Sequence, residues 1–143
     1  MFADDVAAIL DRALATNPND VSSHATRGLV ELDWKGDARP LHKAIESILK
    51  QNPDAIQEVA DSWFICALAE RDATAGERAL VALGENTFGN DALQFPRSFG
   101  EGVIARMMND PAKAQAAFTA ARATQEKRVQ AQPTMAPPCV FSV

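Results

Sequence analysis

Residues 102–121 read GVIARMMNDPAKAQAAFTAA, and this stretch decides the fold. Asn109 suits the left-handed backbone conformation that ends a helix, and Asp110 can accept hydrogen bonds from the free amides that open the next helix. Pro111 fits the first turn of that helix, where its missing N–H costs nothing. The small and aromatic residues that follow at spacings of four and three lie on one helix face. They are Ala114, Phe118 and Ala121. The stretch predicts two helices joined by a tight turn.

The same helical rhythm extends along most of the chain. Alanine and leucine recur at three- and four-residue spacings, and tyrosine is absent. These features predict an all-α protein. Glycine, proline, asparagine and aspartate divide it into seven predicted helices. The helices span 4–16, 21–35, 38–51, 55–71, 73–84, 97–108 and 111–131.

The turns between the helices repeat at a nearly constant interval. Asp37 and Asp72 are 35 residues apart (72 − 37), and Asp72 and Asp110 are 38 apart (110 − 72). A period of this length is typical of stacked helical hairpins. The third hairpin thus has about three extra residues, which we assign to an inserted loop. The predicted single domain, 1–143, comprises an unpaired helix at 4–16, hairpins at 21–51, 55–84 and 97–131, the loop at 85–96, and a tail at 132–143.

These residues resemble the tetratricopeptide repeat, a helix-turn-helix unit of 34 residues. The last hairpin resembles it most, because Gly102, the Asn109-Asp110 turn and the alanine and phenylalanine face all stand at the family's spacing. The preceding hairpins depart from the pattern: Gly28 falls one residue early, Leu41 replaces the usual alanine, and Phe64 replaces a small residue. The resemblance implies a right-handed superhelical stack of about three and a half hairpins.

The resemblance also implies a protein-interaction scaffold that binds a peptide or protein partner on its concave face. The first helix of each hairpin lines that face, and the offsets of 35 and 38 give its equivalent positions. We call this set the predicted groove. It comprises Thr26, Val30, Asp33, Trp34, Asp61, Ile65, Leu68, Phe99, Val103, Arg106 and Met107. An alternative assigns Val30, Ile65 and Val103 to the buried core.

A second functional hypothesis concerns the inserted loop. Its apolar side chains, Phe88, Leu93 and Phe95, could form a lid over an apolar ligand. A closed apolar pocket under the loop would favour this hypothesis, whereas an open face would favour a peptide partner.

Composition excludes several other classes. The net charge of −5 disfavours nucleic acid, because phosphate binding needs a basic excess. The start has no signal-peptide pattern, and no apolar run approaches the length of a membrane helix. We therefore expect a cytoplasmic protein. The first helix and the tail resemble halves of further hairpins, which suggests a fragment of a longer array or a homodimer through these ends.

Chemistry-bearing residues are few. Cys66 and Cys139 lie far apart, and neither His24 nor His42 belongs to a metal-binding motif. We expect no metal, no cofactor and no catalytic residue, and hence a protein that is not an enzyme.

Overall fold

The computed structural model describes residues 2–89 and 94–131. The prediction of an all-α protein is confirmed, since each of the seven predicted helices has a counterpart. The helices are α1 (Phe2–Thr16), α2 (Val21–Lys35), α3 (Arg39–Gln51), α4 (Ala60–Glu70), α5 (Ala73–Leu83), α6 (Arg97–Met107) and α7 (Pro111–Ala131). The predicted tail at 132–143 and the lid residue Leu93 lie outside the described residues.

The turns between helices form as their residues predict. Gly36 and Asn109 adopt the left-handed conformation, with φ of 65° and 58°. Asp110 accepts a hydrogen bond from the Lys113 amide at 3.0 Å. Asp72 accepts one from the Ala75 amide at 2.9 Å. Because each aspartate satisfies an amide that lacks a partner within its helix, the chain can start a new helix at once.

One predicted helix, 55–71, begins differently. A 3-10 helix, η1 (Pro53–Val59), precedes α4, so the prediction of a continuous α-helix from residue 55 is wrong for its first turn. The backbone leaves helical geometry at Val59, whose φ of −122° and ψ of 18° set α4 in a new direction. The Val59 side chain is buried in the core.

The inserted loop also contains regular structure. Strands β1 (Phe88–Gly89) and β2 (Gln94–Phe95) pair antiparallel, with Phe88 opposite Phe95. This small ribbon follows α5 and leads into α6. It brings the two phenylalanines together on one face, because directly opposed residues in an antiparallel pair point to the same side.

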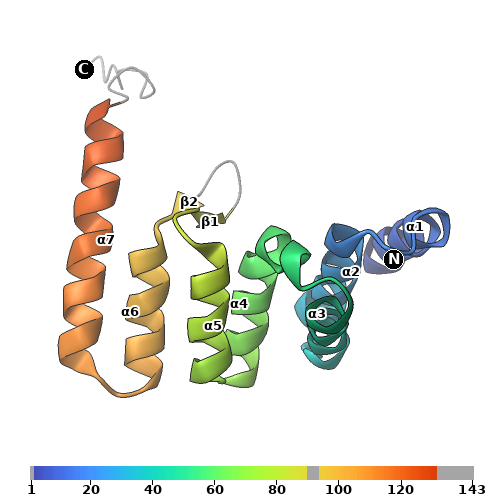
Figure 1. Ribbon diagram of the computed structural model, residues 1–143, viewed down its shortest axis with the longest axis horizontal. Coiled ribbons are helices and arrows are strands. Elements are labelled where there is room, and N and C mark those ends of the chain that lie inside the picture. Colours follow the sequence, from blue (N-terminus) through green and yellow to red (C-terminus); the bar gives the residue numbers. More distant parts are fainter. Residues whose placement is uncertain (1, 90–93, 132–143) are drawn as a thin grey trace, which may run out of the picture.

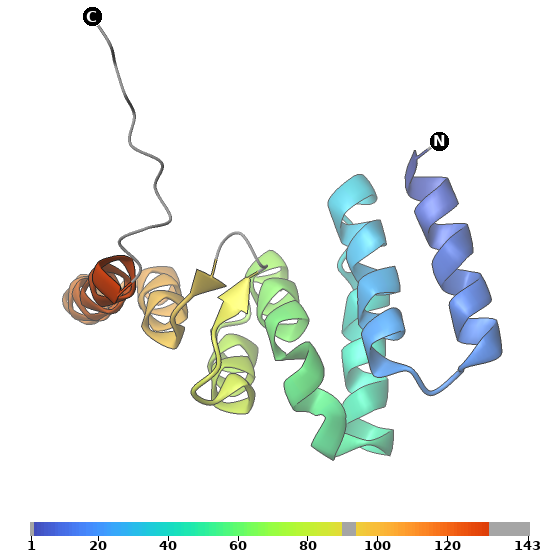
Figure 2. The same cartoon turned by 90° about the horizontal axis from the view of Figure 1, so that it is seen from above.

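Neighbouring helices pack in sequence order along the longest axis, and α1 and α7 lie at opposite ends (Figure 1). The tightest partners are α2 with α3, α4 with α5, and α6 with α7. Figure 2 shows that the axes of α1–α3 lie across those of α4–α7. The change of direction occurs at η1, between the α2/α3 pair and the α4/α5 pair.

The core is continuous from α2 to α6. It contains large side chains from α3, α4, α5 and α6, among them Leu41, Ile45, Phe64, Leu80 and Ile104. The first helix is different, because α1 packs on α2 without a fully buried residue. Within the described residues, no helix is both long enough and apolar enough to cross a membrane.

Candidate functional site

The predicted groove lies on α2, α4 and α6, and every one of its eleven residues keeps solvent-accessible surface. Trp34 is 59% exposed and Ile65 is 43% exposed. Val30 and Val103 are half-buried. None of the three aliphatic residues that could have been core is therefore fully buried.

Contacts hold several of these side chains in place. The Trp34 ring lies 6.4 Å from the ring of Phe2, so α1 supports it from one side. Leu68 and Met107 pack against the core at one edge and are accessible at the other. Thr26 donates its hydroxyl hydrogen bond to the Ser22 carbonyl at 2.8 Å. These side chains are therefore held in place by their own helices and neighbours while part of their surface remains accessible to solvent.

The phenylalanines of the β1/β2 ribbon belong to an aromatic cluster. This cluster comprises Phe64, Phe88, Phe95, Phe99 and Phe118. Successive ring centroids lie 4.8 to 5.7 Å apart, within the range of favourable aromatic pairs. Phe88 and Phe95 therefore contact α4 and α6 directly, and they do not line the cavity beside the ribbon, whose walls are mainly polar. These contacts do not favour an apolar ligand beneath the loop.

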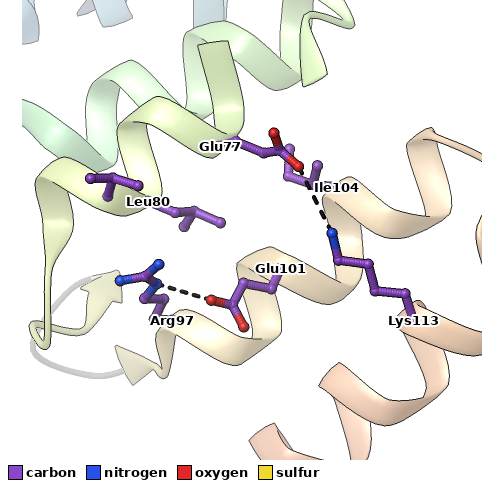
Figure 3. A pocket seen from close by; sticks show the side chains of 7 residues that line it. Glu77, Leu80, Arg97, Glu101, Ile104 and Lys113 are labelled. Carbon is purple, nitrogen blue, oxygen red and sulfur yellow. Dashed lines mark hydrogen bonds and ion pairs between the residues drawn. The ribbon is translucent and has the colours of Figure 1, made fainter. Parts of the chain in front are cut away.

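A cavity of about 420 Å³ lies between α5, α6 and α7 (Figure 3). Its floor is apolar, and two ion pairs cross or border it. Arg97 Nε lies 3.0 Å from Glu101 Oε1, and Lys113 Nζ lies 3.9 Å from Glu77 Oε1. Two acids thus balance two bases, so the cavity offers no unbalanced charge that would select an ion.

A smaller and more closed cavity, of about 180 Å³, lies between α3, α4 and α5. It contains a cluster of three chemically versatile side chains: His42 of α3 with Cys66 and Glu70 of α4. Their donor atoms all lie within 4.8 Å of one another. His42 Nδ1 lies 2.9 Å from Glu70 Oε2, which is a hydrogen-bonded ion pair when the imidazole is protonated. We call these residues the His-Cys-Glu cluster.

The environment of the cluster sets the protonation of its members. Burial raises the pKa of the Cys66 thiol to about 12, and the nearby Glu70 carboxylate acts in the same direction. The hydrogen bond to Glu70 raises the pKa of His42. Cys66 is therefore a neutral thiol at neutral pH. It lacks the thiolate form that a nucleophilic cysteine needs.

The walls of this cavity are positioned by stacking and capping. Arg78 lies over the Trp63 ring, 5.3 Å from its centroid. This cation–π contact holds the Arg78 guanidinium, which also lines the cavity, against an aromatic ring. Asp72 also lines the cavity, but its carboxylate caps α5.

Sequence reasoning missed the His-Cys-Glu cluster because its residues come from two helices. The local spacing contains part of the information: Cys66 and Glu70 are four residues apart, as are His42 and Glu46. Such pairs share a helix face. Nothing in the sequence, however, states that these two faces meet.

Comparison with known proteins assigns no family or activity to this chain. No family model, curated protein or solved structure gave a significant match.

Proposed function

We propose that the chain is a non-catalytic protein-interaction scaffold of the tetratricopeptide type. In this proposal the helical hairpins form a right-handed superhelix, which holds a peptide or protein partner along the predicted groove in the cytoplasm. The accessibility of all eleven groove residues is the observation that carries the proposal. Among these residues, Trp34 (59% exposed) and Ile65 (43% exposed) are the large apolar side chains most open to solvent.

The pairing of helices supports the repeat architecture. Helices α2 and α3, α4 and α5, and α6 and α7 are each other's main partners, as three hairpins require. Equivalent positions also share burial: Leu41 and Ala114 are buried, as are Ile48 and Ala121. Each of these positions is related by the offset of 73 residues that the period gives (35 + 38).

The residue types of the predicted groove indicate what kind of partner segment would bind there. Aliphatic side chains from three helices supply apolar contact area, with Asp33 and Arg106 exposed beside them. Tryptophan and arginine are the residue types that most often dominate binding energy at interfaces. A partner segment with apolar side chains and charges of both signs would match this surface.

The test is a selection of peptides from a display library against the purified full chain, followed by calorimetric titration of the selected peptide. Replacing Trp34 or Arg106 with alanine should weaken binding by about tenfold or more, because truncating such a residue costs about 2 kcal/mol at a binding hot spot. The circular dichroism of both variants should match that of the wild type, since both side chains are exposed.

Matched controls on the outer surface complete this test. Arg122→Ala and Val129→Ala alter exposed residues of α7 outside the predicted groove. We expect both to bind the selected peptide as the wild type does. Equal affinity of the Trp34 and Arg106 variants and the wild type would contradict the groove assignment. A loss of binding in the α7 variants alone would place the binding surface on α7 and not on the predicted groove.

A further inference from the structure

The His-Cys-Glu cluster has the donor arrangement of a metal site. Ligands of a tetrahedral zinc ion, at bond lengths of about 2.0–2.3 Å, lie about 3.3–3.8 Å from one another. The three donors of the cluster lie within 4.8 Å, and Nδ1 and Oε2 are already 2.9 Å apart. Rotation of the three side chains is the adjustment that binding of one ion would require.

The donor types narrow the class of ion. A thiolate and an imidazole nitrogen favour zinc and related transition metals over magnesium or calcium, which prefer oxygen ligands. One thiolate and one carboxylate also neutralise a divalent cation. Binding would release the thiol proton of Cys66 to solvent, and the imidazole would keep a single proton on Nε2.

The surroundings fit such an ion as well. With Nδ1 of His42 as the ligand, Nε2 faces Glu46, whose Oε1 lies 3.7 Å away. Histidine ligands in metal sites commonly turn their other nitrogen towards a carboxylate in this way. The adjoining cavity has room for water, which would supply the fourth ligand.

From these observations we propose that His42, Cys66 and Glu70 bind a zinc-type divalent transition-metal ion. This proposal goes beyond the scaffold function and is independent of it. The ion would tie α3 to α4, two helices that pack against each other less closely than the partners within each hairpin. It would thereby fix the junction at which the helix axes change direction.

The test is a titration of the full chain, freed of metal by a chelator, with Co²⁺. One equivalent should produce the near-ultraviolet charge-transfer band of a cobalt–thiolate bond, and Zn²⁺ should displace the cobalt. Cys66→Ser should abolish the band, because it removes the sulfur. His42→Gln should lower the Co²⁺ affinity about tenfold or more. At one and the same Zn²⁺ concentration, the midpoint of thermal unfolding should rise more for the wild type than for His42→Gln, because the weaker binder gains less stability.

The chain supplies its own matched controls, since it contains two histidines and two cysteines. Cys139→Ser and His24→Gln should keep the band and the wild-type affinity. Three results would overturn the proposal. The wild type could give no stoichiometric band, Cys66→Ser could keep the band, or His42→Gln could bind Co²⁺ as tightly as the wild type. Because His42 is exposed at the surface, its variant should fold normally and decides the question even if Cys66→Ser is unstable. None of these results bears on peptide binding.

Discussion

The helix pairs α2/α3 and α6/α7 occupy equivalent positions in the period, but they use their glycines differently. A Cβ atom on Gly28 would lie 2.5 Å from the Cα of Leu41, so α2 and α3 touch backbone to backbone. A Cβ atom on Gly102 would lie 2.6 Å from Cε1 of Phe118, so this glycine makes room for an aromatic ring. Glycine therefore allows the helices of the α2/α3 pair to approach closely, and in the α6/α7 pair it leaves space for a large side chain.

The shift of one residue between the two glycines explains the difference. Gly102 corresponds by the period to position 29 (102 − 73), whereas the glycine of α2 stands at position 28. One residue turns a side-chain position by about 100° around the helix. The α2 glycine thus faces Leu41, the equivalent of Ala114, and the α6 glycine faces Phe118, one turn further along its partner helix.

Gly28→Ala should produce the largest change in the free energy of unfolding. The added methyl group meets backbone, which cannot move without separating the helices, so overpacking costs about 3 kcal/mol. The better helix propensity of alanine returns about 1 kcal/mol. We expect a net loss of about 2 kcal/mol, measured by urea denaturation. A variant as stable as the wild type would show that α2 and α3 can separate freely.

Gly102→Ala should cost less, about 1 kcal/mol, because the half-buried ring of Phe118 can turn aside and only part of the overpacking cost remains. Gly76→Ala is the matched control. Its new methyl group would meet the end of the Ile104 side chain, which borders the cavity between α5, α6 and α7 and can move into it. We expect the control to change the free energy of unfolding by about zero. If Gly102→Ala were more damaging than Gly28→Ala, the contrast between the two pairs would be reversed.

The smallest effect should come from the turn of the α2/α3 pair. Hydrogen bonds from the Arg39 guanidinium and amide lower the pKa of Asp37 to about 2. The stability that this carboxylate contributes is present above its ordinary pKa of about 3.9 and is lost as pH falls towards 2. The difference in urea midpoint between the wild type and Asp37→Asn should therefore shrink between pH 5 and pH 2. The same experiment in an Arg39→Gln background should show a smaller difference at pH 5. A difference independent of pH would contradict the ion pair.

Much of the fold follows from short-range chemistry. Helix α2 ends just before Gly36 and helix α7 begins at Pro111, as these residues predict. Capping and turn formation depend only on residues within a few positions of one another. The aromatic cluster was less accessible to this reasoning. Phe64 departs from the repeat pattern, and the ring of Phe88 in the ribbon, 5.3 Å from its own, accounts for the large side chain at this position.

The sequence by itself determined the α-helices apart from the start of α4, and the turns between most of them, since a period of 3.6 residues and a few capping residues suffice for these. Only the tertiary structure decided where α4 points after the bend at Val59, and that direction sets the contact between α3 and α4. His42 meets Cys66 and Glu70 as a consequence of that contact. The physical reason is that helix formation is local, whereas the angle between two helices depends on how their side chains pack together.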